Sequence, residues 1–379
     1  MTLSTTLTTP IIVGVDFGTT ASGISFSRAL PPQPSVYPPP EVYKNWPLGA
    51  GEGKVPSRVA LAADNIDHGF RADDRPIWGF AVRPDMNAYS WFKLLLDAQG
   101  PLTDWDDTDA LGVAGSLGIF RHLKLPAETV AAGYLQQIYQ RLLRILNSCP
   151  PLHFWFPVPA SWSMEALAAT ERAARRAGFG ERPGDRLTFI AEPEAAAFGA
   201  LVSLAVPFED NQAVMVVDCG GGTVDATTML ITKANPFEWR RLTVFQGGRC
   251  AGSSIDIRIH KLMAERFRNA FVEVPLRFKG PGSTFMICIS KAELEPCFDP
   301  VVKKIEGIIH AQLVAVKSFS DCSVSVRKQR IILVGGLAQS AYVQHAIRYR
   351  FETPNMAAEV PHEARLAVVR GAALRGMQG

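Results

Sequence analysis

The ten residues 216–225, Val-Val-Asp-Cys-Gly-Gly-Gly-Thr-Val-Asp, constrain the fold of this 379-residue chain more than any other stretch. The apolar run 213–217 predicts a buried strand, and the β-branched pattern of 223–231 predicts a second strand after the glycines. Three successive glycines let a turn point its backbone N–H groups at one spot, with no Cβ to keep an anion away. A carboxylate at each end can hold a hydrated Mg²⁺. The stretch therefore predicts a phosphate-binding hairpin, with an ordinary glycine-rich hairpin as the alternative.

A second unit near the N-terminus has the same order of strand, aspartate, glycine, threonine and strand. Residues 11–15 predict a buried strand, Asp16-Phe17-Gly18-Thr19-Thr20 follows, and residues 24–28 predict the returning strand. A third apolar strand, 331–334, ends in Gly335-Gly336. The first two units lie about two hundred residues apart, so we expect two related lobes that each offer a hairpin to one cleft.

These motifs resemble, in order and spacing, the phosphate-1, connect-1, phosphate-2 and adenosine segments of the actin-like ATPase superfamily. The connect-1 match is Glu192-Pro193-Glu194-Ala195-Ala196-Ala197, whose spelling, like that of 218–225, resembles the heat-shock protein 70 (DnaK-like) nucleotide-binding domain. Trp91-Phe92-Lys93-Leu94 and Phe298-Asp299-Pro300 are more similar to its divergent type-12 branch, common in fungi. The resemblance implies an α/β protein with the ribonuclease H-like, duplicated two-lobe fold and a central nucleotide cleft.

The resemblance covers the chain from about residue 10 to 377 and divides it into lobes. It implies a disordered N-terminus at 1–9, a first lobe at 10–200 and a second lobe at 201–379. A terminal helix at 365–379 can pack back on the first lobe. No substrate-binding domain is expected after Gly379.

The outer subdomain of the second lobe is expected to be shortened. After a helix expected at 255–271, only about fifteen residues (272–286) stand where the family has the subdomain that holds adenine and ribose. Gln339 stands where the standard chaperones place an arginine beside adenine. The resemblance thus implies intact phosphate chemistry and partly dismantled base recognition.

The resemblance implies ATP and Mg²⁺ as cofactors and slow hydrolysis of ATP as the reaction. The residues expected to hold the metal are Asp16 and Asp218. The residues expected to orient the attacking water are Lys93, Glu192, Thr223 and Asp225. The residues expected to contact the phosphates and the ribose are Gly18, Thr19, Thr20, Gly220, Gly221, Gly222, Thr223, Gly335 and Gly336.

Two of these residues also have ordinary structural interpretations. A lysine among Trp91, Phe92 and Leu94 commonly extends from an apolar face to solvent, which is the alternative for Lys93. A glutamate in the first turn of a helix interacts favourably with the helix dipole, which is the alternative for Glu192. The sequence leaves both alternatives open.

Two other stretches predict no functional site. Residues 49–54 superficially resemble a Walker loop, but that loop needs glycine where Leu48 stands and serine or threonine where Val55 stands. Lys54 instead begins a strand entry that resembles the family's Val-Pro-Ser segment. Residues 97–126 are acidic and loop-rich, without the glycine and glutamate spacing of an EF-hand, and predict no function.

Capping residues and apolar spacing predict two helices in particular. Ser163 is expected to cap a helix that runs to about Ala177, with Gly178 as the residue that ends it. An amphipathic helix is expected at 300–316, with Pro300 as its first residue.

Composition excludes several classes of protein. The net charge of +3, without a clustered basic run, gives no reason to expect nucleic acid. No apolar stretch reaches the ~18 residues of a membrane helix, the N-terminus has no signal-peptide pattern, and the cysteines are scattered. We therefore expect a cytoplasmic protein whose partners are ATP and ADP, with co-chaperones or client proteins as further candidates, and neither nucleic acid nor membrane.

Two other functions stay open. A pseudo-ATPase, or nucleotide-sensing interaction module, would account for the shortened subdomain and the missing substrate domain. A small-molecule kinase of the same superfamily would share the Asp-Gly-Thr-Thr hairpin and use the second-lobe aspartate as a general base. Glu192-Pro193-Glu194-Ala195 favours the chaperone and actin-like side over the kinases.

Overall fold

The computed structural model describes residues 9–28, 38–71, 75–98, 100–110, 112, 125–147, 150–235, 237–269, 289–318 and 329–378. The disordered segment predicted at 1–9, apart from its last residue, lies outside this part of the chain. The shortened stretch predicted at 272–286 also lies outside it.

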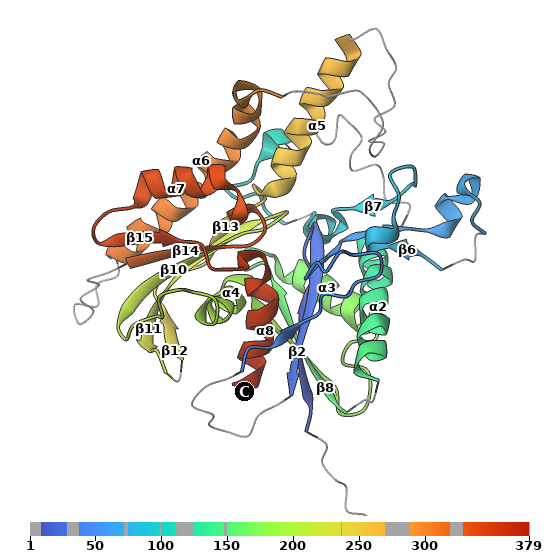
Figure 1. Ribbon diagram of the computed structural model, residues 1–379, viewed down its shortest axis with the longest axis horizontal. Helices are drawn as coiled ribbons and strands as arrows, with labels where there is room; N and C mark the ends of the chain where they lie inside the picture. The colour runs from blue at the N-terminus through green and yellow to red at the C-terminus, as the bar shows by residue number, and fades with distance from the viewer. Residues whose placement is uncertain are drawn as a thin grey trace, which may run out of the picture.

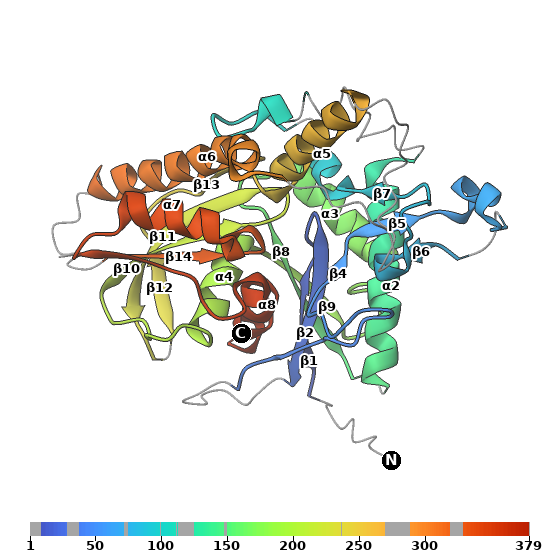
Figure 2. The same ribbon diagram turned by 45° about the horizontal axis from the view of Figure 1, so that its top comes forward.

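The first sheet follows the strand order β3-β2-β1-β8-β9, with β4 also paired to β2. Its first hairpin is antiparallel, and β8 and β9 then continue parallel to β1 (Figures 1 and 2). The strands are β1 (Ile11–Asp16), β2 (Ala21–Arg28), β3 (Glu41–Val42), β4 (Val55–Pro56), β8 (Leu152–Val158) and β9 (Arg186–Ala191).

The second sheet repeats this plan in the order β12-β11-β10-β14-β15, with β13 also paired to β11. Again an antiparallel hairpin is extended by strands parallel to its first member. The strands are β10 (Gln212–Cys219), β11 (Val224–Lys233), β12 (Glu238–Arg241), β13 (Gln246–Gly248), β14 (Gln329–Val334) and β15 (Met356–Glu359). The predicted hairpins and the duplicated two-lobe α/β fold are thus confirmed.

Helices cover both faces of each sheet, because alternate residues of the central strands point to opposite sides. Ile11 and Val13 face a core under α2 (Ala127–Leu146) and α3 (Met164–Ala177). Val214 faces the layer between the sheets, whereas Met215 faces the outer helices of the second lobe. Those outer helices are α5 (Gly252–Asn269), α6 (Lys291–Ser318) and α7 (Ala341–Phe351).

The layer between the sheets is a pair of helices, α4 (Glu192–Leu201) and α8 (Ala367–Met377), which lie side by side in Figures 1 and 2. A side chain at Gly199 would overlap the backbone of Ala367, and one at Gly371 would overlap that of Ala195. Small residues therefore let the two helices touch backbone to backbone. α8 also covers the first sheet, where Ser25 Oγ donates a hydrogen bond to the carbonyl of Val369 at 2.6 Å.

A smaller sheet of β5 (Arg58–Ala60), β6 (Ile77–Trp78) and β7 (Tyr89–Ser90) extends the first lobe beside α2. Single-turn 3₁₀ helices connect these strands: η1 (Ala62–Asp64), η2 (Ile66–His68) and η3 (Gly79–Ala81). After β7 comes the longer 3₁₀ helix η4 (Phe92–Asp97), and two more, η5 (Leu337–Gln339) and η6 (Ala364–Leu366), flank α7 and α8. Within the described residues, none of the helices combines the length and the apolar character needed to cross a bilayer.

The two helix predictions have different outcomes. Ser163 Oγ accepts a hydrogen bond from the N–H of Ala166, and Gly178 ends α3 at φ +110°, as predicted. The start predicted for α6 is wrong, because α6 begins at Lys291 and contains both Pro296 and Pro300. Each proline removes one helical hydrogen bond, and burial of the apolar face of α6 against the second sheet offsets that loss.

Candidate functional site

The turns of the two hairpins meet face to face. The first turn joins β1 to β2, and the second joins β10 to β11. A side chain at Gly221 would overlap that of Thr20, and one at Gly222 would overlap that of Thr19. The threonines of the first turn therefore require glycine in the second.

A cavity of about 520 Å³ opens beside these turns. The predicted site residues that line it are Asp16, Gly18, Thr19, Thr20, Lys93, Glu192, Asp218, Gly220, Gly221, Gly222, Thr223, Gly335 and Gly336. Asp225 is not part of this lining. Sequence reasoning missed other members of the wall: Glu52, Lys54, Phe80, Asp256 and Arg365.

Lys93 and Glu192 form a buried ion pair, with 2.8 Å between Nζ and Oε1. Lys93 comes from η4 in the first lobe, and Glu192 is the first residue of α4. The Lys93 ammonium also lies 5.2 Å from the ring centroid of Trp162. Lys93 is only 3% exposed, so it does not extend to solvent. Burial raises the pKa of Glu192, and the neighbouring Lys93 ammonium acts in the opposite direction.

Asp16 is the last residue of β1, Asp218 is the second-to-last residue of β10, and both are buried. Burial raises the pKa of Asp218 well above its ordinary value, and the nearby carboxylates of Glu192 and Asp16 raise it further. Asp218 Oδ1 has no hydrogen-bond partner. Gly335, at φ +90°, lies so close to this oxygen that any side chain there would overlap it.

Lys54 forms an ion pair with Asp16, with 2.6 Å between Nζ and Oδ2. The ammonium is close to Asp16 Oδ2, but its direction does not meet the geometry of a hydrogen bond, and this oxygen accepts none. No local pattern in the sequence indicates this pair, since strands β2 and β3 lie between the two residues in the chain.

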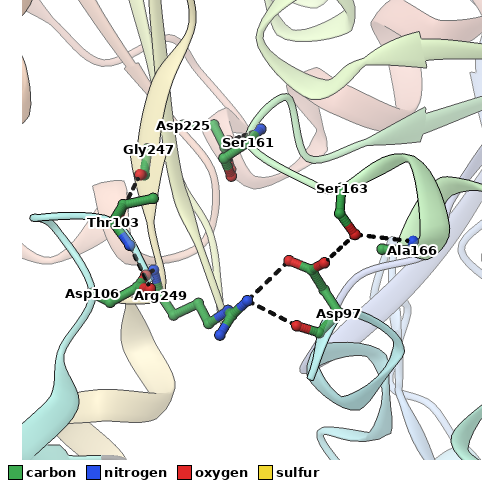
Figure 3. Close-up of polar contacts among 9 residues, drawn as sticks. All are labelled: Asp97, Thr103, Asp106, Ser161, Ser163, Ala166, Asp225, Gly247 and Arg249. Carbon is green, nitrogen blue, oxygen red and sulfur yellow. Dashed lines mark hydrogen bonds and ion pairs between the residues drawn. The ribbon is translucent and has the colours of Figure 1, made fainter. Parts of the chain in front are cut away.

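Asp225 is held by the first lobe rather than exposed to the cavity. Ser161 donates two hydrogen bonds to Asp225 Oδ1, from Oγ at 3.0 Å and from its N–H at 3.3 Å (Figure 3). Ser161 lies three residues after the end of β8 at Val158. Burial raises the pKa of Asp225, and its Oδ2 lacks a hydrogen-bond partner.

The acidic segment that predicted no function joins the two lobes. Arg249 of the second lobe donates to the carbonyl oxygen of Asp97 at 2.8 Å and to its Oδ2 at 2.9 Å, and its own N–H donates to Asp106 (Figure 3). Arg258 of α5 binds both carboxylate oxygens of Asp107. These pairs lie about 150 residues apart in the chain, and a sequence alone carries no sign of them.

The donor set fits a hydrated magnesium ion. One buried oxygen each on Asp218 and Asp225 has no hydrogen-bond partner, which is costly unless a cation or water satisfies it. The corresponding oxygen of Asp16 also accepts no hydrogen bond, but the Lys54 ammonium lies 2.6 Å from it. Within the described residues, no three His, Cys, Asp or Glu side chains converge as a direct metal cluster. Mg²⁺ suits such a place, because it binds through one or two carboxylates and keeps several waters.

Comparison with known proteins gives relatives of one kind. Heat shock 70 kDa protein 12B of Homo sapiens is 21% identical over 97% of this chain and 68% of its own length. Heat shock 70 kDa protein 12A is 26% identical in Homo sapiens and 24% in Mus musculus, over 72% of this chain. This chain spans about half the length of both 12A proteins, at 48%. No family model matches the chain.

The alignment with protein 12B runs over 480 positions, more than the 379 residues of this chain, so the relative has additional residues inside the matched region. The names of these relatives agree with the type-12 resemblance of the sequence motifs. The paired hairpins and the two similar sheets agree with the two-lobe fold that the resemblance implies. The chain is a divergent relative of the type-12 branch of heat-shock protein 70, and it has the actin-like ATPase fold.

Proposed function

We propose that this protein binds Mg²⁺-ATP between its two lobes and hydrolyses it slowly to ADP and phosphate. Support comes from the buried carboxylates of Asp16 and Asp218, which line one cavity beside the two glycine and threonine turns, and from Asp218 Oδ1, which has no hydrogen-bond partner. Phosphoryl transfer needs mainly positioning and neutralisation of charge, and this arrangement offers both.

Asp16 and Asp218 hold the hydrated ion, which neutralises phosphate charge when it is bound. The backbone N–H groups of Gly220–Gly222 and the hydroxyls of Thr19 and Thr20 bind the β- and γ-phosphates. Gly335 and Gly336 allow the backbone to approach the α-phosphate and the ribose.

The Lys93–Glu192 pair and Thr223 orient the attacking water from the cavity wall. Asp225 acts indirectly, because it accepts a hydrogen bond from Ser161 and is not part of the cavity lining. We therefore assign Asp225 as a positioning residue that fixes the second turn against the first lobe.

The test is a titration with a fluorescent ATP analogue, followed by single-turnover hydrolysis of ATP. Asp218→Ala is expected to abolish Mg²⁺-dependent turnover, whereas Asp67→Ala, an exposed aspartate on η2, leaves it unchanged. Undiminished hydrolysis in the Asp218 variant would remove the assignment. Turnover that a sugar or polyol stimulates would indicate a small-molecule kinase instead.

A nucleotide-sensing module without turnover is the second candidate. The Lys54–Asp16 ion pair favours it, because an ammonium group lies on a carboxylate that the ATPase assigns to the metal. Tight binding of the analogue without any hydrolysis by the wild-type protein would decide for this candidate. Co-chaperones and clients would then be sought as partners of the nucleotide-bound form.

A further inference from the structure

Lys54 is a cavity residue that the sequence left without a role. It precedes β4, where Val55 pairs with Ser22 of β2, so its backbone is fixed beside the first hairpin. A Cβ at Gly23 would lie 3.2 Å from Lys54 Cγ, so the glycine leaves room for the lysine stem. The side chain is 16% exposed and carries its ammonium to Asp16.

The cations on the described part of the cavity wall differ in what they contact. Lys93 is paired with Glu192 at 2.8 Å, and Arg365 is paired with Glu52 at the edge of the cavity. Lys54 alone contacts a residue that the proposed function assigns to the metal.

We propose that Lys54 is a second phosphate-binding cation that occupies Asp16 when the divalent ion is absent and moves to the phosphates when the ion binds. This inference rests on the proposed nucleotide function. A lysine suits the exchange because its ammonium is a point charge on a flexible four-carbon stem, so it can change partners without movement of the backbone. The Lys54 ammonium on Asp16 Oδ2 and a hydrated ion beside the same carboxylate repel each other, so the two cations compete for Asp16.

Two consequences of opposite sign follow. Without nucleotide, Lys54 competes with the divalent ion for Asp16, so removal of its charge strengthens binding of the ion. With nucleotide, Lys54 adds a favourable contact to the phosphates, so the same change weakens binding of ATP. A lysine with a purely structural role produces neither pattern.

The first experiment measures Mn²⁺ binding to the nucleotide-free, full-length chain from the electron paramagnetic resonance signal of free Mn²⁺. Lys54→Met is expected to bind Mn²⁺ about tenfold more tightly than the wild type. Lys54→Arg keeps the charge and stays within about twofold. Lys44→Met is the matched control, because Lys44 is an exposed lysine paired with Glu363 outside the cavity. Equal Mn²⁺ affinities in all four proteins would overturn the proposal.

The second experiment titrates the same proteins with a fluorescent ATP analogue, with Mg²⁺ and with EDTA. Lys54→Met is expected to weaken binding about tenfold with Mg²⁺ and to abolish the weaker binding that we expect of the wild type in EDTA. If Lys54→Met binds the analogue like the wild type, the phosphate contact is wrong although the ATPase proposal stands. If the wild type binds no analogue with Mg²⁺, the proposed function fails, and the phosphate role of Lys54 fails with it.

Discussion

Arg258 grips both carboxylate oxygens of Asp107, with 2.6 Å from Nη1 to Oδ2 and 2.7 Å from Nη2 to Oδ1. This ion pair attaches the segment after η4 to α5 of the second lobe. The same segment is anchored further by Thr103, whose hydroxyl donates to the carbonyl of Gly247 at 3.1 Å (Figure 3). The segment after η4 of the first lobe therefore contacts the second lobe through residues that do not line the cavity.

Arg258→Met is expected to lower the free energy of unfolding by about 2 kcal/mol, because it leaves the buried Asp107 carboxylate without its partner. Urea unfolding followed by circular dichroism measures the change. The matched control is Arg172→Met, which breaks an exposed pair with Glu128 and is expected to cost less than about 0.5 kcal/mol. Equal losses in the two variants would contradict a structural role for the Asp107 pair.

The Asp107 pair also predicts a dependence of stability on pH. Burial tends to raise the pKa of Asp107, but hydrogen bonds from Arg258 and the N–H of Ala110 hold it below the ordinary value of 3.8. A carboxyl group with a lowered pKa stabilises the fold above its unfolded pKa and loses this contribution as the pH falls through its folded pKa. The stability difference between wild type and Asp107→Asn should be constant from pH 7 to 5 and shrink below about pH 4. A difference that grows in acid would exclude this explanation.

Gly335 and Gly336 provide a test variant and its matched control in the second lobe. Gly335→Ala is expected to cost about 2 kcal/mol of stability, because alanine is strained at φ +90° and its Cβ would overlap Asp218. It should also weaken binding of the ATP analogue, since Asp218 must move. Gly336→Ala meets no atom within 4 Å and should leave the stability of the nucleotide-free protein unchanged. Thermal unfolding of both variants distinguishes them, and similar midpoints would argue against the tight approach of Gly335.

The contact between α4 and α8 predicts a strong effect of one methyl group. Gly371→Ala is expected to destabilise the protein by about 4 kcal/mol or more, because the new Cβ would overlap the Ala195 backbone. Gly133→Ala in α2 is the control, since its Cβ meets no atom within 4 Å. That change should be neutral or stabilise by up to about 1 kcal/mol. The yield of folded protein and its urea midpoint provide the measurement.

The hairpins were predictable because their information is local. The apolar run, the three glycines, the flanking aspartates and the β-branched pattern all fall within residues 213–231, and the two strands pair directly with each other. The cap at Ser163 and the end at Gly178 are local in the same sense. The resemblance extended this reach to Lys93 and Glu192, which lie 99 residues apart and still form an ion pair.

Contacts between distant residues were not predictable in this way. Lys54 meets Asp16, and Arg249 meets Asp97, only because the sheets bring separate loops together. The start of α6 was wrong for a related reason, since Pro296 and Pro300 read locally as helix breakers. Tertiary burial overrode that local preference. The residues next to a proline in the chain do not indicate whether burial of the whole helix will offset its lost hydrogen bond.

The position of α8 bears on how the protein is made. This last helix lies on the first strand, where a Cβ at Gly14 would meet the Val369 carbonyl at 2.5 Å. While the ribosome is still producing the second lobe, one face of the β1 sheet has no cover, and its apolar residues stay open to water or to other nascent chains. The face of the first sheet that carries Ile12 is therefore not covered until residues 367–377 have been made. We expect molecular chaperones to protect that face of the sheet during this interval.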